Sequence, residues 1–347
     1  MGGTARSGVW FPAIRSGSGA DVFVERLAAG LNALGVRAEV SWLPHHAEYA
    51  PWLVAKPRVP EWAGVAHLNT WLPRRFVPKR IPTVQTLHFC VHGEEFAPYR
   101  SKLQAAYHGL CIEPRERINV RCASRVVAVS AETARQSAAV FGRRDIGVIA
   151  NGVPVDAPFL PQVRDLPHRP FRLLYLGNWS RRKGADLLAP IMRNLGDGFE
   201  LLYTSDRAGA HGNFEPPPYA RSLGRLSGAD AIAGACHEAD ALLFPSRMEG
   251  LALSVLEAMA CGLPVIAARV SSLPEVVDHG SSGWLCESAT AASFAAGARL
   301  LRDHTQLWRS MGEQARQKVV REFSLARMVR HYLELYGQLL AEEWIQA

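Results

Sequence analysis

Residues 8–42 read GVWFPAIRSGSGADVFVERLAAGLNALGVRAEVSW, and they decide the class of fold. The apolar run 8–14 predicts a buried strand, and a glycine-rich loop follows it. Apolar residues then recur at helical spacing until Gly35 ends the helix. They are Phe23, Leu27, Leu31 and Leu34. Residues 36–42 alternate apolar and polar side chains as a strand does. This order predicts a βαβ unit with parallel strands.

The same alternation of strand and helix continues along the chain. Further strand candidates lie at 65–69, 82–88, 125–130 and 147–151. Residues 153–170 contain five prolines and no clear period, so we expect an interdomain linker there. A second series of strand candidates follows it, at 171–177, 199–204, 241–246 and 264–268. We therefore predict an α/β protein of two doubly wound domains that face each other across a ligand-binding cleft.

Length and composition agree with this organisation. A chain of 347 residues is longer than one compact core usually holds. The 48% hydrophobic and 20% charged content is typical of a soluble globular protein. No apolar run approaches the roughly 20 residues that span a bilayer, and we expect no secretory signal. The six cysteines form no C-x-x-C pair, so reduced thiols in a cytoplasmic protein are expected.

The net charge of +7 favours anionic partners such as nucleotides or phospholipid surfaces. A solvated basic surface is the alternative. Nucleic acid is not expected, because the chain has neither a zinc-finger pattern nor an RNA-recognition signature.

Residues 249–267, EGLALSVLEAMACGLPVIA, carry the most chemical information. They predict a helix from about Leu253 to Cys261. Glu249 and Glu257 are eight residues apart, near two helical turns, so both carboxylates can face one side. The helix N-terminus suits phosphate, whereas the carboxylates suit the hydroxyls of a ribose or hexose. The alternative is a buried helix with an accidental acidic pair.

This stretch resembles the E-x7-E region of the retaining glycosyltransferases of family 4, which have the GT-B fold of two Rossmann-like domains. The resemblance extends in order over nearly the whole chain. Its other segments are RSGSGADVFVERLAAGLNALGVRAEV (15–40), TLH (86–88), VVAVSAETARQSAAVFG (126–142), VIANGVPVDAPF (148–159), LGNWSRRKGADLL (176–188), ADALLFPSRMEG (239–250) and LPEVVDHGSSGWL (273–285).

The expected domains follow the GT-B pattern. An acceptor-side domain is expected over residues 1–160 and a nucleotide-sugar-binding domain over 161–325. A helix over 326–347 is expected to cross back and pack on the N-terminal domain. Ser324 is its expected N-cap. Its apolar stripe is Leu325, Met328, Tyr332, Leu335 and Leu339.

The resemblance implies donor contacts for the acidic helix and the turn before it. The residue matching Glu249 contacts the donor sugar, and the one matching Glu257 contacts the nucleotide ribose. Backbone N–H groups of the turn meet the sugar and phosphates. The expected donor-binding residues of this turn are Gly250, Leu251, Ala252 and Leu253. The family often has glycine where this chain has Ala252, which reduces the room there.

The RRK run supplies the expected diphosphate site. Lys183 matches the family lysine that binds the diphosphate and neutralises charge as the nucleotide departs. The family's other basic residue often follows the glycine at the strand end, but this chain has Asn178 there. Arg181 or Arg182 can substitute, and Arg182 is favoured because a guanidinium can grip phosphate with two hydrogen bonds. A solvated surface loop is the alternative.

The first domain is expected to contribute a glycine loop and a histidine. Gly17, Ser18 and Gly19 lie at a helix start, where glycine permits close approach of backbone to a ligand. The loop lacks the third glycine of a dinucleotide fingerprint. The resemblance implies contacts between this loop and the donor phosphates, and between His88 and the donor sugar. His92 is a weaker candidate for the sugar contact. His45 and His46 are weaker candidates for the acceptor side.

No metal or cofactor is expected. The chain has no Asp-x-Asp motif, and the family is metal-independent. The nucleotide-sugar is a co-substrate, carrying UDP or GDP, with ADP donors also known in the family. The family retains anomeric configuration, so we expect front-face attack by an acceptor hydroxyl, with the leaving phosphate accepting its proton.

The acceptor is open from sequence. Residues 71–82, WLPRRFVPKRIP, interleave apolar and basic side chains, as a segment on an anionic membrane surface does. We hypothesise peripheral attachment to the cytoplasmic face of the inner membrane and a glycan or lipid-linked acceptor, as in lipopolysaccharide or exopolysaccharide assembly. The alternatives are a soluble transferase acting on a small metabolite, a nucleotide-sugar-binding protein without catalysis, and a dehydrogenase.

Overall fold

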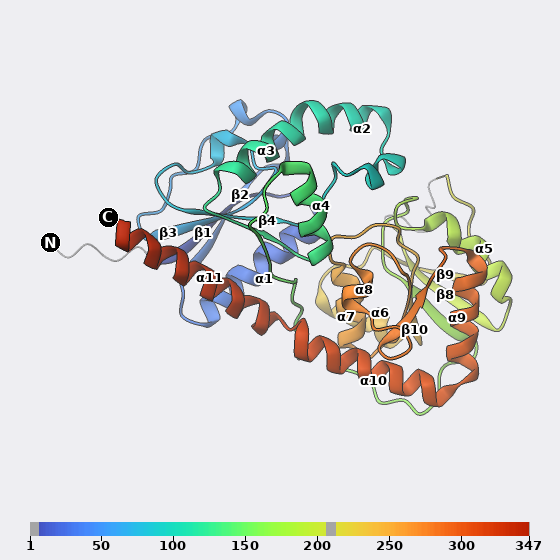
Figure 1. Ribbon diagram of the computed structural model, residues 1–347. Coiled ribbons are helices and arrows are strands. Elements are labelled where there is room, and N and C mark those ends of the chain that lie inside the picture. Colours follow the sequence, from blue (N-terminus) through green and yellow to red (C-terminus); the bar gives the residue numbers. More distant parts are fainter. Residues whose placement is uncertain (1–6, 206–212, 347) are drawn as a thin grey trace. The chain divides into compact units, whose positions relative to one another are not determined.

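The computed structural model describes residues 7–205 and 213–346, with side chains up to residue 342 (Figure 1). The chain forms two compact units, and each is described by itself. The first unit comprises Met1–Asn151 together with Leu325–Ala347, and the second comprises Gly152–Ser324. The division falls at Asn151/Gly152 and at Ser324/Leu325, whereas the sequence placed the first boundary at residue 160.

A six-stranded parallel sheet in the order β2-β1-β3-β4-β5-β6 forms the first unit. The strands are β1 Gly8–Ile14, β2 Ala38–Leu43, β3 Ala63–Asn69, β4 Thr83–Leu87, β5 Arg125–Ala128 and β6 Ile146–Val148. The helices are α1 Gly19–Ala33, α2 Lys102–Tyr107, α3 Glu113–Cys122 and α4 Ala131–Phe141. A π-turn, η5 His108–Ile112, joins α2 to α3. Four short 3-10 turns complete the unit: η1 His45–Glu48, η2 Pro51–Leu53, η3 Arg74–Phe76 and η4 Glu94–Tyr99.

Helix α11, Leu325–Gln346, belongs to the first unit although it ends the chain, and it runs along α1 (Figure 1). Its apolar stripe packs in one core with α1, which contributes Phe23, Leu27 and Leu31. The close approach depends on Gly30, because a Cβ there would lie 2.4 Å from Cγ2 of Val329.

Two tyrosines of α11 reach a buried polar group beneath the helix. The Nδ1 atom of His67 lies 2.5 Å from the hydroxyl of Tyr336, and its Nε2 lies 2.7 Å from Oγ1 of Thr86. The Tyr332 hydroxyl lies 3.1 Å from the same Thr86 oxygen. These bonds satisfy a histidine that the surrounding core removes from water.

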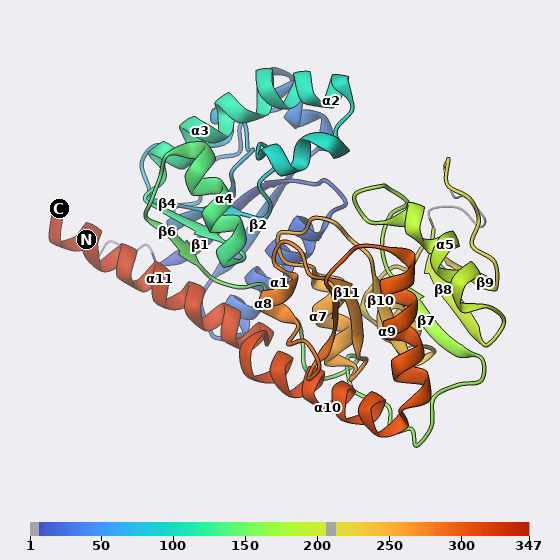
Figure 2. The ribbon, with the colours of Figure 1, turned by 45° about the vertical axis from the view of Figure 1, so that its right-hand side comes forward.

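The second unit contains another six-stranded parallel sheet, in the order β12-β11-β10-β7-β8-β9 (Figure 2). The strands are β7 Phe171–Tyr175, β8 Phe199–Thr204, β9 Ala220–Gly224, β10 Ala241–Phe244, β11 Val265–Ala268 and β12 Gly283–Cys286. The helices are α5 Ala185–Leu195, α6 Ala229–His237, α7 Leu253–Ala260, α8 Leu273–Val276, α9 Ala291–Asp303 and α10 Thr305–Glu322. The predicted pair of doubly wound parallel sheets is confirmed. The sequence missed β9 and β12, the two edge strands.

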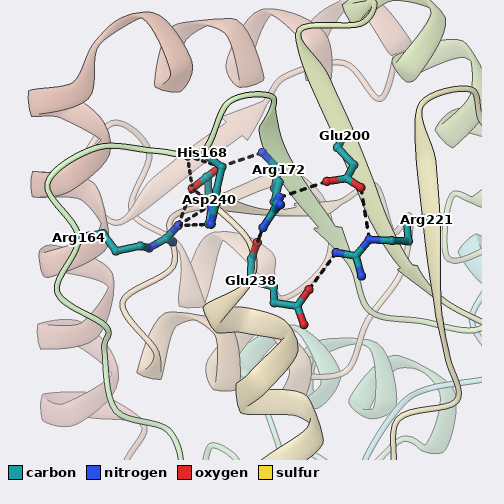
Figure 3. A network of polar contacts seen from close by, with 7 residues as sticks. All are labelled: Arg164, His168, Arg172, Glu200, Arg221, Glu238 and Asp240. Carbon is teal, nitrogen blue, oxygen red and sulfur yellow. Dashed lines mark hydrogen bonds and ion pairs between the residues drawn. The ribbon is translucent and has the colours of Figure 1, made fainter.

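The proline-rich segment 153–170 is the first part of the second unit and packs on it. It is therefore not a separate linker. The carboxylate of Asp240, fully buried before β10, accepts hydrogen bonds from Arg164 Nη1 at 2.9 Å and from the backbone N–H of Arg172 at 2.8 Å (Figure 3). It also accepts from the backbone N–H of His168 at 3.1 Å. Such convergent donors offset the cost of burying a carboxylate and fix the segment against the sheet.

No helix in the described part of the chain is both long enough and apolar enough to cross a membrane.

Candidate functional site

A pocket of about 550 Å³ opens in the second unit where β7, β8 and β9 end. Its floor comes from loops at the carboxyl ends of these parallel strands, which is where doubly wound sheets bind ligands. Helices α6 and α7 supply the rest of the wall. The lining residues are Leu176, Gly177, Asn178, Trp179, Thr204, Ser205, Arg225, Leu226, Ile232, Ser254 and Glu257.

Hydrogen bonds between two strand ends shape this pocket. The backbone N–H of Gly177 donates to Oγ1 of Thr204 at 3.1 Å, and that hydroxyl donates to the Gly177 carbonyl at 3.2 Å. The indole N–H of Trp179 donates to the Thr204 carbonyl at 2.9 Å. Because these hydrogen bonds join the loop after β7 to the end of β8, Asn178 and Trp179 have fixed positions on the pocket wall.

Helix α7 brings Glu257 to the pocket. The helix begins at Leu253, as the spacing predicted, and Ala252 at its N-cap has no side-chain acceptor for the first-turn N–H groups. Glu257 lies inside the helix with only 4% of its surface exposed, yet it lines the pocket together with Ser254. A buried carboxylate on a cavity wall is a strong acceptor for the hydroxyls of a bound ligand.

Glu249 forms an ionic cluster with the RRK run. The Nζ atom of Lys183 lies 2.6 Å from Oε1 of Glu249, and Nη1 of Arg182 lies 3.6 Å from the same oxygen. The hydroxyl of Ser246 also donates to this oxygen. Both Lys183 and Glu249 are largely buried, with 17% and 9% of their side chains exposed. Their charges therefore interact at lower dielectric than a surface pair does.

The backbone around this cluster is tightly constrained. Gly184 has a φ of 75°, and a Cβ there would lie 2.3 Å from the carbonyl oxygen of Pro245. Only glycine fits this contact, which brings the RRK run against the Ser246–Glu249 turn. Nearby, burial and the Glu249 carboxylate both raise the pKa of the Tyr175 hydroxyl, which donates to the Asn178 carbonyl at 2.9 Å.

The second unit thus divides the predicted residues between two neighbouring positions. Asn178 and Glu257 line the pocket. Lys183, Arg182 and Glu249 form the cluster, and among the described residues they are not part of the pocket lining. The turn of Gly250, Leu251 and Ala252 connects Glu249 to α7 at Leu253.

Hydrogen bonds within the glycine loop of the first unit fix it at the start of α1. Helix α1 begins after Ser18, whose hydroxyl accepts from the N–H of Ala20 at 3.3 Å. The Asp21 carboxylate accepts from the N–H groups of Ser16 at 2.9 Å and Gly17 at 2.7 Å. The Gly17 N–H is therefore bonded to a carboxylate of the following helix. Gly17 still supplies the turn before Gly19, with a φ of 69°.

His88 follows β4 and is held by two kinds of contact. Its Nε2 lies 3.0 Å from Oδ1 of Asn69, and its ring packs edge-on against Phe23, with 4.8 Å between centroids. Burial lowers the pKa of His88 to about 4, so the imidazole is neutral near pH 7. Burial and the neighbouring His88 likewise lower the pKa of His67 to about 3.

The weaker histidine candidates have other partners. The Nε2 atom of His92 lies 2.5 Å from Oε2 of Glu116, whose other oxygen accepts from the hydroxyl of Thr70. His45 and His46 lie in the exposed η1 turn, where the His45 ring packs against a tyrosine. Among the described residues, no group of three or more His, Cys, Asp or Glu side chains could hold a metal ion.

The segment 71–82 does not have the membrane-facing surface that its sequence suggested. Its apolar side chains Leu72, Phe76, Val77 and Ile81 are buried in a core cluster of the first unit. Only its basic residues, such as Arg75 and Lys79, are exposed. The hypothesis that these four side chains enter a bilayer is therefore wrong, whereas Trp71 of the same segment is half-buried.

Several pocket residues were not identified from sequence. Thr204 and Ser205 end a predicted strand, so the strand-end rule could have found them. Arg225 follows β9, an edge strand with the mixed sequence ARSLG, so nothing in the sequence placed it.

In the first unit, the sequence analysis did not identify Asp21, which could have been suspected as an acidic residue in the first turn of a helix.

Two family models match the chain. "Glycosyltransferase Family 4" matches residues 59–157, and "Glycosyl transferases group 1" matches residues 170–303. The chain is thus similar to the family 4 glycosyltransferases over the first of these regions and to the group 1 glycosyltransferases over the second. Its relatives include N-acetyl-alpha-D-glucosaminyl L-malate synthase of Bacillus anthracis, 37% identical over 34% of this chain and 31% of that protein. Glycogen synthase of Mycobacterium tuberculosis is 26% identical over 89% of this chain and 72% of that protein.

Solved structures agree with the GT-B fold of this family. Sucrose-phosphate synthase from Thermosynechococcus elongatus superposes with a TM-score of 0.76 at 20% identity, covering 97% of this chain and 100% of that one. The Anabaena protein HepE in complex with UDP-glucose superposes with a TM-score of 0.70 at 16% identity, covering 96% of this chain and 100% of that one.

Proposed function

We propose that this glycosyltransferase moves a sugar from a nucleoside-diphosphate sugar to a hydroxyl acceptor with retention of anomeric configuration. The observation that carries the proposal is the buried Glu257 on the wall of the 550 Å³ pocket at the strand ends. A cavity of this size suits a small organic ligand, and a carboxylate there suits a hydroxylated one.

The second unit supplies the proposed donor site. Glu257 accepts hydrogen bonds from the nucleotide ribose, and Asn178 lies on the same wall. The turn of Gly250, Leu251 and Ala252, continuing into Leu253, offers backbone N–H groups to the sugar and phosphates, supported by the helix dipole of α7. Glu249 contacts the donor sugar while Lys183 holds its carboxylate.

Lys183 and Arg182 balance the charge of the departing diphosphate without a metal ion. Their cationic groups lie 2.6 Å and 3.6 Å from one oxygen of Glu249, so they already converge on one point. Cations fixed in advance stabilise a developing negative charge without reorganisation cost. The acceptor hydroxyl attacks from the face of the leaving phosphate, which takes its proton.

The family resemblance supports roles in donor binding for residues of the first unit. Ser18 and Gly19, on the loop that Gly17 turns, approach the donor phosphates, and His88 contacts the donor sugar. Because its pKa lies near 4, His88 acts as a neutral hydrogen-bonding group and not as a cation.

The donor is a UDP-sugar in the first instance and a GDP-sugar in the second. Structural neighbours have been solved in complex with UDP nucleotides, including HepE with UDP-glucose and TarM with UDP. The acceptor is a growing glycan of a polysaccharide, on a lipid carrier at the cytoplasmic face of the inner membrane. Relatives named for amylovoran and colanic acid biosynthesis support this acceptor class. The relative named N-acetyl-alpha-D-glucosaminyl L-malate synthase favours a soluble small metabolite as the second candidate acceptor.

Thermal melting against UDP-, GDP-, ADP- and dTDP-sugars, without metal, tests the donor site. A ligand at 100 times its Kd stabilises the protein by about 2.7 kcal/mol, so one nucleotide class is expected to raise Tm. Glu257→Gln is expected to abolish that shift. Glu287→Gln, at an exposed carboxylate paired with Arg269, is the matched control and is expected to keep it.

Two results would contradict the proposal. The first is the absence of a shift with every donor at millimolar concentration in folded protein. The second is a donor shift without release of nucleoside diphosphate when acceptors are added, which would identify a binding protein that lacks catalysis.

A further inference from the structure

The helical segment 102–122 of the first unit, formed by α2, η5 and α3, exposes a row of apolar side chains. Leu103 is 84% exposed, Leu110 is 78% exposed and Ile118 is 47% exposed. The opposite side packs into the unit through Ile112 and Val120, which are 6% and 1% exposed. The segment therefore has one face that packs into the unit and an exposed face with apolar side chains.

Arginines flank this row at its α3 end. Arg117 and Arg121 line a pocket of about 950 Å³ together with Arg143, Arg144 and Ile118. Two nearby carboxylates are already used, since Glu113 pairs with Arg117 at 2.7 Å and Asp145 with Arg143 at 2.9 Å. Arg121 and Arg144 are exposed and have neither a hydrogen bond nor an ion pair within the described part of the chain.

A second exposed apolar turn is packed beside the same segment. The ring of Tyr49 in the η1–η2 region lies 5.6 Å from that of Tyr107, whose hydroxyl donates to Glu48 at 2.9 Å. A few residues further, η2 exposes Trp52 and Leu53 by 69% and 72%. Exposed apolar side chains therefore occur on two elements that contact each other.

We propose that this face of the first unit docks on an anionic phospholipid bilayer. Apolar side chains with unpaired arginines beside them match the two layers of such a surface, acyl chains below and phosphate head groups above. The arginine-lined pocket takes a head-group phosphate, which guanidinium groups bind with paired hydrogen bonds. The inference rests on the membrane part of the proposed function and places the membrane contact on residues 102–122, not on residues 71–82 as the sequence suggested. It involves no residue of the donor site.

Co-sedimentation of the full chain with vesicles tests this surface. Vesicles with 30% phosphatidylglycerol are expected to bind it, and pure phosphatidylcholine vesicles at least about tenfold more weakly. Leu103→Asp with Leu110→Asp is expected to lower the partition coefficient at least about tenfold, because a carboxylate does not enter the acyl region. The matched control, Val163→Asp with Leu166→Asp, changes two exposed apolar residues of the second unit and is expected to bind normally.

Arg121→Glu with Arg144→Glu is a second variant, at side chains whose loss breaks no described contact. It is expected to weaken vesicle binding and to reduce its salt dependence, while the donor-induced Tm shift stays intact.

Failure of the wild-type chain to bind anionic vesicles overturns the proposal. So does normal binding by both variants. Gel filtration in which the leucine variant alone dissociates a dimer would instead identify a self-association surface. Loss of the donor shift in the wild type would concern the donor site and leave the vesicle result standing.

Discussion

Lys183 and Glu249 are 66 residues apart in the chain, yet their charged atoms lie 2.6 Å apart in a largely buried position. Neither charge is easily removed, because the partner would remain buried without compensation. The pair therefore orders both side chains before any donor binds. A donor diphosphate would meet an ammonium whose position is already fixed.

Lys183→Ala is expected to lower kcat/KM by about 10² to 10³, the typical cost of removing one group that stabilises a departing anion. Initial rates with saturating acceptor measure this loss. Arg193→Ala, which breaks a half-exposed ion pair with Glu215, is the control and is expected to keep wild-type rates. Equal loss in both variants would show that the effect comes from general destabilisation.

The buried histidines make stability depend on pH. Burial lowers the pKa of His88 to about 4 from 6.5 in the unfolded chain. Between these values the unfolded state binds more protons, so stability falls as pH falls. From pH 7 to pH 5 this histidine is expected to cost about 2 kcal/mol. Urea unfolding of the wild type and of His88→Asn at both pH values checks this. The variant is expected to lose about 2 kcal/mol less, and equal losses would contradict it.

At the scale of elements, the contact between α1 and α11 depends on a missing side chain. Gly30 lets Val329 approach so closely that a Cβ would overlap it at 2.4 Å. Glycine within a helix costs roughly 1 kcal/mol relative to alanine. At this position the tight interhelix contact outweighs that cost.

Gly30→Ala is therefore expected to destabilise the protein by about 1 to 3 kcal/mol, since it overpacks a close contact. Gly337→Ala in α11, where nothing lies within 4 Å, is the matched control and is expected to be neutral or stabilising. Adding Val329→Ala to Gly30→Ala should recover part of the loss in a double-mutant cycle followed by urea unfolding. If Gly337→Ala were destabilised as much as Gly30→Ala, the loss could not be attributed to the contact with Val329.

Sequence predicted the elements best where the apolar signal is continuous. The runs GVWFPAI and FRLLY became β1 and β7, and the spacing of 253–261 gave α7 nearly to the residue. The edge strand β9 was missed because ARSLG mixes polar and apolar residues, and β12 because GWLC is only four residues long. Residues 71–82 misled for another reason. An apolar and basic alternation does not tell which side faces the core, and here the apolar side does.

Sequence indicated some residues of the candidate site but not their arrangement. The family motif indicated Glu249, Glu257 and Lys183. The division between a pocket and a separate ionic cluster depends on contacts between distant segments. The same holds for Asp21, whose carboxylate occupies the N–H of Gly17, because a side-chain rotamer decides that bond.

At the scale of the whole molecule, the second unit is inserted within the first. In the sequence, residues 152–324 come after the strands of the first sheet and before α11, the helix that completes the core of that sheet. A chain ending at residue 324 would expose Phe23 and Leu27 and would leave His67 without its Tyr336 partner. Hydrogen exchange of this truncation is expected to show lost protection in β1, β3 and β4, with protection kept in β7 and β10. Retained protection in β3 would contradict the role given to α11.

The position of α11 also sets an order for synthesis on the ribosome. All strands and helices of the second unit have been translated at residue 324. The first unit still lacks α11 at that point. Translation thus finishes the later-encoded unit before the earlier one. During that delay the nascent first sheet lacks its last covering helix, and its apolar surface is a natural target for a chaperone. A message cut short after the codon for residue 324 would yield a protein with a complete second unit and an incomplete first unit that quality-control proteases can recognise.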